Sequence, residues 1–262
     1  MLSLRRKHCR LTRTLALAAV WHASAPARAQ NAYGAEARAP RESFEMARSV
    51  SIVTREQASQ AAAGNVGDML SQAHAVVVQR TASGSATPIL RGLTGYQVLL
   101  MADDLRLNDS LTRAGGSATL NLIDPESVAQ IDVIRGPASV LYGSDALGGV
   151  VHVRTQGTKA SETAAPWGAA SAFVRGASAE RSLRAQGSVD GALGPFGLRI
   201  SGGAGHAGEL LRGGDLGLQP FTGHTDWSIA SRFEAVPARD HRIAVAYQAG
   251  HQLQVPRPDV SR

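Results

Sequence analysis

The chain has 262 residues and a formal net charge of +6, a balance that first suggests a negatively charged partner such as a nucleic acid. Six basic residues and no acidic ones lie within residues 1–29, however, so the rest of the chain carries 21 basic against 21 acidic residues. The body of the protein is therefore formally neutral, and no nucleic-acid partner is expected. The single cysteine, Cys9, also lies in the basic segment, which excludes a disulfide from the rest of the chain.

Residues 1–29 have the layout of a secretory signal peptide. A basic stretch at residues 5–13 precedes an apolar run of 12 residues, and small residues then fit cleavage between Ala29 and Gln30. A membrane-spanning helix needs roughly 20 residues, so the apolar run is too short for one, although a retained anchor remains the alternative. The sequence thus predicts export, with residues 30–48 as a polar, flexible leader.

Residues 49–157 alternate short apolar runs with turns, as expected of a compact α+β unit. Residues 55–73 are helix-like, and Gly64 breaks the pattern within them. Alternating or β-branched runs elsewhere predict strands. The predicted strands cover residues 49–54, 75–80, 87–93, 96–104, 131–135 and 150–154.

A glycine-rich stretch, IRGPASVLYGSDALGGVVHVRT at residues 134–155, invites three interpretations as a chemical site. It lacks the G-x-G-x-x-G of a dinucleotide site, the G-K-[ST] of a phosphate-binding loop and the G-x-S-x-G of a hydrolase elbow. Ser144, Asp145 and His152 have the composition of a catalytic triad but not its context, and a secreted hydrolase using Ser144 is a hypothesis that Ser144→Ala would test. We therefore expect no catalytic residue, no metal and no cofactor.

The same stretch fits a strand, a tight turn and a second strand. Pro137 fixes φ and suits the start of a short helical turn, and Gly143 can take the positive φ that ends it. Gly148 and Gly149 then let the backbone fold tightly into the strand at residues 150–154. These glycines are expected to shape the backbone.

From Trp167 onward the sequence alternates large apolar residues with small or polar ones. Phe196, Leu198 and Ile200, for example, share one strand face, while Gly, Ser, Arg or Gln fill the other. A soluble sandwich would have large aliphatic residues inside, whereas this pattern is typical of a strand with lipid on one side and water on the other. Residues 167–262 are predicted to form about five antiparallel strands, the opening part of a transmembrane β-barrel.

The connections between these strands support a membrane topology. Those at residues 191–195 and 236–240 are short, while those at 176–181 and 205–225 lie on the opposite side, the latter being long. Outer-membrane barrels have short periplasmic turns and longer external loops, so residues 205–225 are expected outside the cell.

The first half of the chain resembles the plug domain of TonB-dependent outer-membrane receptors. The resemblance rests on RGLTGYQVLLMADDLRLND, on LIDPESVAQIDVIRGPASVLYGSDALGGVVHVRT and on the strand at residues 49–54, and the later strands match the start of the barrel. It implies a plug at residues 49–157 inside a barrel of about 22 strands in the cell outer membrane. It also implies uptake of a ligand driven by TonB of the inner-membrane complex. Ligand candidates are an iron–siderophore, haem or a cobalamin-like compound.

The resemblance gives several plug residues structural roles. Arg91 and Arg135, each followed by glycine, are similar to plug arginines that pair with carboxylates of the plug or barrel. Tyr142 is expected to pack under the glycine turn with its hydroxyl hydrogen-bonded. The plug structural motif comprises Arg91, Gly92, Arg135, Gly136, Pro137, Tyr142, Gly143, Gly148 and Gly149.

Two regions depart from the family pattern. Asp103 and Asp104 stand where the family usually has Asp-Gly, so this hairpin is expected to be strained or differently shaped. Together with Asp109 they could suggest a cation site, for which a turn is the simpler explanation. The leader at residues 30–48 holds at most a degenerate TonB box.

Histidines offer the few candidate ligand contacts. His206 and His224 fall in the long connection expected outside the cell, and His74 falls in the plug. Their imidazoles could bind haem iron, with ordinary surface histidines as the alternative.

The chain is short for this family. A barrel of about 22 strands, each of roughly 9 to 11 residues, needs well over roughly 400 residues. We therefore expect the N-terminal part of a receptor, unable to transport alone. The alternative is a stand-alone secreted plug-like binding or interaction protein in which residues 167–262 form a small soluble sheet.

Overall fold

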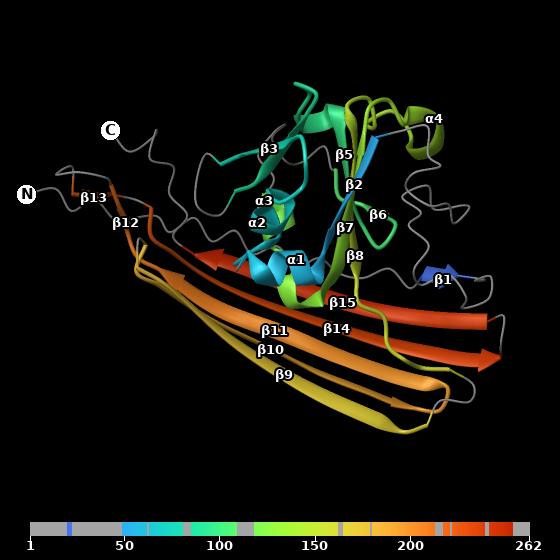
Figure 1. Cartoon of the computed structure of the whole chain (residues 1–262). Coiled ribbons are helices and arrows are strands. Elements are labelled where there is room, and N and C mark those ends of the chain that lie inside the picture. Colours follow the sequence, from blue (N-terminus) through green and yellow to red (C-terminus); the bar gives the residue numbers. More distant parts are fainter. Residues whose placement is uncertain are drawn as a thin grey trace, which may run out of the picture.

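The computed structural model describes most of the chain from residue 49 onward. The described residues are 20–22, 49–61, 63–80, 85–108, 118–161, 165–178, 180–212, 217–220, 222–238 and 241–253. The proposed cleavage site at Ala29 and Gln30, the leader at residues 30–48 and most of the proposed signal peptide lie outside these residues. An N-terminal α+β domain rests on one face of a long, curved antiparallel sheet (Figure 1).

The N-terminal domain, taken here from β2 to β8, is built on a five-stranded sheet in the order β2-β7-β8-β5-β6. All neighbours are antiparallel except β5 and β8, which run parallel. The strands are β2 (Ser49–Thr54), β3 (Val76–Gln79), β4 (Thr87–Leu90), β5 (Val98–Ala102), β6 (Leu105–Arg106), β7 (Val128–Arg135) and β8 (Gly149–Thr155). The helices are α1 (Arg55–Gln60), α2 (Val66–Leu70), η3 (Gly95–Gln97), α3 (Ala118–Asn121), η4 (Pro125–Ser127) and α4 (Ser139–Tyr142).

The predicted helix at residues 55–73 is two short helices, with the break around Gly64 as expected. Thr54 and Gln57 form a capping box at the start of α1, which satisfies backbone N–H groups that have no partner within the helix. The Asn65 side chain accepts from the Asp68 N–H and so caps α2. Two separate caps in one stretch explain why the chain restarts its helix instead of continuing it.

The core of this domain lies between its sheet and the short helices. Leu70, Leu120 and Ile131 are fully buried there, together with valine side chains of β7 and β8. A second, smaller cluster gathers Leu99, Ile134 and Val150 near α4. Each fully buried Leu or Ile contributes roughly 2 kcal/mol, so the domain has a core of its own.

Five long strands form the second part of the chain in a simple antiparallel meander. They are β9 (Trp167–Ala177), β10 (Ser182–Leu193), β11 (Phe196–Ala207), β14 (His224–Ala238) and β15 (His241–Leu253), as the sequence predicted. A small hairpin of β12 (Leu210–Leu211) and β13 (Leu218–Gln219) lies in the long connection. The described sheet is open, with β9 at one edge and β1 (Val20–His22), within the proposed signal peptide, paired to β15 at the other. No helix in the described ranges is long and apolar enough to cross a bilayer.

The two faces of the long sheet differ, and the N-terminal domain covers the polar one. Side chains that face the domain are mostly Ser, Gly, Gln, Arg, Asp and Glu, and those that face away are large and apolar. The exposed apolar side chains of β10, β11, β14 and β15 are Leu183, Val189, Leu193, Phe196, Leu198, Ile200, Trp227, Ile229, Phe233, Ile243, Val245, Tyr247 and Leu253. A water-soluble protein would bury this apolar face against the domain, so the arrangement is the reverse of a soluble core.

Candidate functional site

The glycine-rich stretch forms the predicted strand, turn and strand. Gly136, Gly143 and Gly149 have φ of 103°, 98° and 149°, which other residues rarely adopt. A Cβ on Gly149 would stand 2.2 Å from the carbonyl oxygen of Ile134, where β7 and β8 pair. Gly148 donates to Gln97 O at 2.7 Å and accepts from Gly136 N at 2.9 Å. The glycines are therefore required by the backbone, and no ligand is needed to explain them.

Tyr142, at the end of α4, packs against the smaller apolar cluster. Its carbonyl oxygen accepts from Arg106 Nη2 at 3.0 Å, and Arg106 also contacts Asp145 at 3.2 Å. Pro137 lies two residues before α4. The hydrogen bond expected for the Tyr142 hydroxyl stays a prediction.

The two motif arginines lie close together. Arg135 donates to the hydroxyls of Ser49 and Ser51 on β2 and to the carbonyl of His74, so its partners in the described residues are not the carboxylates that we expected. Arg91 and Gly92 form a tight turn with φ of 51° and 80°, and the Arg91 guanidinium lies against Gly136. Burial and the nearby Arg91 charge lower the pKa of Arg135. Arg135 thus ties the edge strand β2 to the rest of the domain.

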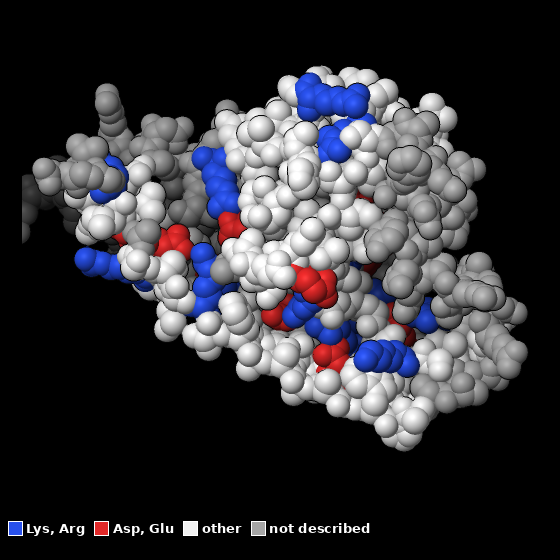
Figure 2. All heavy atoms as spheres, in the orientation of Figure 1, with Lys and Arg blue, Asp and Glu red and all other residues white. Residues whose placement is uncertain are grey.

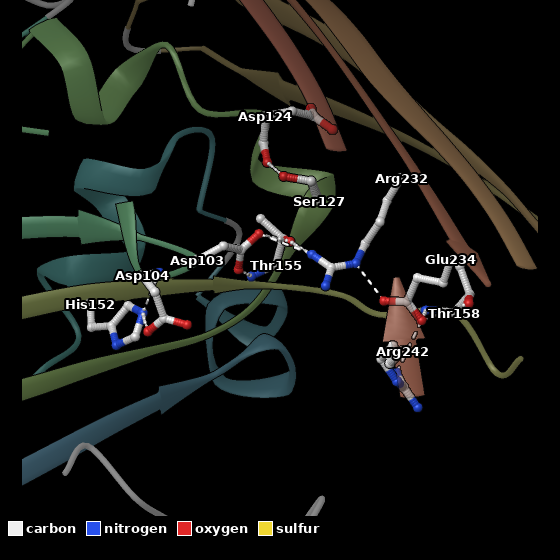
Figure 3. Close-up of polar contacts among 10 residues, drawn as sticks. All are labelled: Asp103, Asp104, Asp124, Ser127, His152, Thr155, Thr158, Arg232, Glu234 and Arg242. Atoms are coloured by element: carbon white, nitrogen blue, oxygen red, sulfur yellow. Dashed lines mark hydrogen bonds and ion pairs between the residues drawn. The ribbon is translucent and has the colours of Figure 1, made fainter. Parts of the chain in front are cut away.

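The Asp103-Asp104 turn joins β5 to β6 and touches the long sheet. Both residues have positive φ, 44° and 69°, so the departure from Asp-Gly keeps the turn shape but places two strained side chains in it. Asp103 accepts from the Thr155 N–H at 2.8 Å and from Arg232 Nη1 of β14 at 3.1 Å (Figure 3). The acidic pair therefore forms a turn, which is the simpler of the two explanations, and this turn also contacts the long sheet. Asp109 lies outside the described residues.

Among the described acidic residues of the long sheet (the wall), Glu234 of β14 is the most deeply buried, with 0% exposure. Its carboxylate accepts from Arg232 Nε at 2.6 Å, from Arg242 Nη1 at 3.1 Å and from Thr158 at 2.8 Å and 3.2 Å (Figure 3). Thr158 lies in the segment that leads from the N-terminal domain to β9. Gly197 leaves room for it, because a Cβ there would stand 2.2 Å from Thr158 Oγ1.

Asp124 anchors the domain at a second point and is also 0% exposed. Its carboxylate accepts from the hydroxyls of Ser228, at 3.0 Å, and Ser201, on neighbouring strands β14 and β11. On β15, Gly250 approaches so closely that a Cβ would stand 2.4 Å from the carbonyl oxygen of Leu122. One short segment of the domain therefore contacts three adjacent wall strands.

The next turn of the chain adds a third anchor. Arg199 of β11 donates to the carbonyl oxygen of Glu126 at 3.0 Å and pairs with Asp190 of β10. Arg55 of α1 donates to the same carbonyl at 2.8 Å and pairs with the Glu126 carboxylate. The η4 turn is thus held between the domain and the sheet.

The interface as a whole is polar and balanced in charge. Asp103, Arg232, Glu234 and Arg242 alternate in sign, and Figure 2 shows acidic and basic side chains gathered along the line where the domain meets the sheet. Because hydrogen bonds and ion pairs hold the two parts, and each side faces the other with polar groups, the domain can separate from the wall without exposing its core. The described contacts therefore hold the domain on the sheet through polar groups.

The candidate ligand histidines lie apart. His206, near the end of β11, shares the outward face with Ile200 and contacts Thr225 at 3.1 Å. His224, at the start of β14, faces the inner side, 3.9 Å from Asp226, which also pairs with Arg184. The two imidazoles are on opposite faces of the sheet, so they do not bind one ion together. Among the described residues, no group of three His, Cys, Asp or Glu could hold a metal.

Ser144, Asp145 and His152 do not come together. Ser144 Oγ contacts the neighbouring Asp145 at 3.2 Å on the surface. His152 is buried in β8 with 1% exposure, and its Nε2 faces the turn residue Asp104. Burial, and after it the Arg154 charge, lower the pKa of His152 despite three acidic groups nearby.

Sequence reasoning missed most of the interface residues. Arg199, Arg232 and Glu234 occupy inward positions of strands whose outward positions were recognised by their apolar residues. Charged residues at such positions signal a contact with the domain, because an unpaired charge on a wall covered by protein is unfavourable. Asp124 stands directly before Pro125 in a stretch already quoted for its resemblance, but its contacts with Ser201 and Ser228 depend on the docking of the domain.

Comparison with known proteins identifies the N-terminal domain. The sequence model of the TonB-dependent Receptor Plug Domain matches residues 42–150. The vitamin B12 transporter BtuB of Vibrio vulnificus is 35% identical over 109 residues, which are 41% of this chain and 17% of that protein.

Solved structures share the fold across both the domain and the sheet. The copper transporter OprC superposes with a TM-score of 0.64 at 15% identity, over 78% of this chain and 30% of OprC. The siderophore receptor PirA of Acinetobacter baumannii gives 0.59 at 22% identity, over 78% and 31%. The ferric enterobactin receptor PfeA of Pseudomonas aeruginosa, in complex with enterobactin, gives 0.58 at 21% identity, over 79% and 33%. The chain thus spans a third or less of the length of each of these proteins.

Proposed function

We propose that this chain, which belongs to the TonB-dependent receptor family, supplies the plug and wall strands of a receptor that imports a metal complex or a cobalamin-like ligand. The members named above are transporters and receptors for vitamin B12, copper and siderophores. The proposed role is transport without catalysis. Iron–siderophore, haem and cobalamin are the candidate ligands, and the outer membrane is the proposed location, reached by means of the signal peptide at residues 1–29.

One observation carries this proposal: the plug covers the polar face of the sheet and leaves the apolar face outward. Lipid is the environment that favours large apolar side chains on the outside of a β-sheet whose other face is polar. Trp227 on that face, near one end of β14, is an amphipathic aromatic side chain of the kind common near membrane interfaces. A plug on the polar side then occupies the place where a ligand would otherwise pass.

A pair of arginine substitutions at one depth tests the lipid-facing assignment. Ile229 points outward near the middle of β14, and Gln248 points inward from β15 opposite Ala230. Ile229→Arg should weaken insertion of the full chain into phospholipid vesicles by about 2 to 4 kcal/mol, and Gln248→Arg by much less. Vesicle flotation across a urea series measures both. Equal losses would overturn the proposal and favour a secreted plug-like binding protein.

The transport role and the TonB partner need a test in cells. We expect deletion of the gene in its source bacterium to abolish uptake of one radiolabelled compound among ferric enterobactin, haem and cyanocobalamin. Removal of TonB from the wild-type strain should abolish uptake of the same compound. Uptake of all three that survives gene deletion, or uptake that survives loss of TonB, would contradict the proposed function.

A further inference from the structure

His152 occupies the centre of the plug sheet. It stands on β8 opposite Asp132 of β7 and beside Met101 of β5. The Asp104 N–H donates to His152 Nε2 at 3.3 Å, so this nitrogen presents a lone pair and the neutral ring carries its proton on Nδ1. Nδ1 has no hydrogen-bond partner among the described residues. The turn therefore contacts the neutral ring at Nε2 through the Asp104 N–H.

The charged groups around the ring come from three elements. Asp104 and Asp103 belong to the turn between β5 and β6, Asp132 to β7 and Arg154 to β8. Asp132 is already bonded to Arg154 Nε at 2.6 Å and to Gln130 Nε2 at 2.7 Å. The Asp104 carboxylate, 3.6 Å from His152 Nε2, is the group placed to accept a hydrogen bond from a protonated Nε2.

The turn that contacts the ring is the turn that contacts the wall. Asp104 bonds His152, and its neighbour Asp103 bonds both Thr155 and Arg232 of β14 (Figure 3). Both turn residues have positive φ, a conformation that a non-glycine residue keeps only when its surroundings hold it. A change at Nε2 therefore acts on Asp104, and the adjacent residue, Asp103, makes the contact with the sheet.

We propose that protonation of His152 releases the Asp103-Asp104 turn and thereby weakens the Asp103–Arg232 contact, so that acid loosens the plug from the sheet. A proton from water added at Nε2 would point at the Asp104 N–H, and two donors cannot share that space. The turn must rotate to bring the Asp104 carboxylate to the new N–H, and Asp103 moves with it. The inference concerns a contact within this chain and stands whichever ligand the receptor imports.

The direction of the pH effect follows from linkage. A histidine in the unfolded chain has a pKa of about 6.5, and burial lowers the pKa of His152 in the folded plug. The unfolded chain thus binds more protons at this ring, and the stability contributed by the neutral ring is lost as the pH falls below about 6.5. Loosening is accordingly expected in acid and not in base.

Hydrogen exchange in the full chain, in detergent micelles, tests the proposal. The Thr155 amide reports the turn because it donates to Asp103 at 2.8 Å. Its protection, corrected for the intrinsic rate, should fall as the pH is lowered from 7.5, in step with titration of the His152 ring. For each unit by which the pH falls, the ratio of charged to neutral ring rises about tenfold.

Three variants separate the switch from ordinary acid destabilisation. His152→Gln, which can keep an acceptor toward Asp104, should hold Thr155 protection constant, and His206→Gln on the outward face should behave as wild type. Asp104→Asn tolerates the positive φ and removes the charge that favours the protonated ring, so the midpoint should move to lower pH. Loss of protection that persists in His152→Gln, or a midpoint that rises in Asp104→Asn, would overturn the proposal.

Discussion

Replacement of Glu234 by glutamine tests whether a buried carboxylate holds the plug on the wall. The native side chain accepts four hydrogen bonds, from Arg232, Arg242 and two groups of Thr158. Glutamine keeps one acceptor oxygen, and its NH₂ group is a donor facing other donors. The substitution therefore leaves two guanidinium groups without their shared counter-charge while side-chain volume is conserved.

The size of the effect follows from burial. Removal of one partner of a buried ion pair costs about 3 to 5 kcal/mol. The Arg232 and Arg242 side chains keep 22% and 26% of their exposure, so water screens part of the uncompensated charge and we expect about 2 to 4 kcal/mol. Opening of the Thr158 amide, which donates to Glu234, should then become roughly 30 to 900 times more frequent.

Hydrogen exchange of the Thr158 amide in the full chain measures this directly. Glu180→Gln is the matched control, because Glu180 lies in the turn between β9 and β10 of the same sheet and pairs with Arg175 at 3.8 Å, but is 35% exposed. The control should change Thr158 exchange by less than about fivefold. If Glu234→Gln gives no larger change than the control, the carboxylate does not hold the plug and the reasoning from burial is wrong.

Two glycine substitutions test the close contacts of the backbone. Gly197→Ala places a Cβ 2.2 Å from Thr158 Oγ1 and should speed exchange of the Thr158 amide as Glu234→Gln does, while Gly168→Ala, whose nearest contact is an ordinary 3.7 Å, should not. Gly149→Ala combines positive φ with a carbonyl oxygen 2.2 Å away and should cost more than about 3 kcal/mol of plug stability. Gly92→Ala meets nothing within 4 Å and should cost only about 1 to 2 kcal/mol. Urea unfolding of the full chain compares the last two, and equal losses would show that the close contact adds nothing to backbone strain.

The sequence predicted those features that local chemistry determines. The strand at β2 was placed to the residue, because its alternation is bounded by polar residues and a capping threonine. The positive φ at Gly143 followed from a short helical turn that must end before Ser144. The outward face of the long sheet also followed, since side chains in a strand alternate with a period of two.

Sequence reasoning failed where partners lie far apart along the chain. Arg135 was expected to meet a carboxylate, but an extended β2 brings two serine hydroxyls and a backbone carbonyl within its reach. The His206 and His224 pair was treated as one loop, whereas the strands continue to both residues and turn them to opposite faces. In each case the residue type was informative and the neighbour was set by packing.

The contact between Asp103 and Arg232, 129 residues apart, shows where the limit lies. Strand parity says that Arg232 faces inward, and an inward charge demands a partner. The alternation of strand faces does not determine the position of the plug along the strands of the wall. A shift by two residues would offer a different inward side chain to the same turn. That position is fixed by the sum of three anchors, at Asp124, Glu126 and Thr158, each of which excludes the shifted placements of the others. The docking of the plug is therefore a property of the assembled interface, and only the list of residues available to it can be read from either half of the chain.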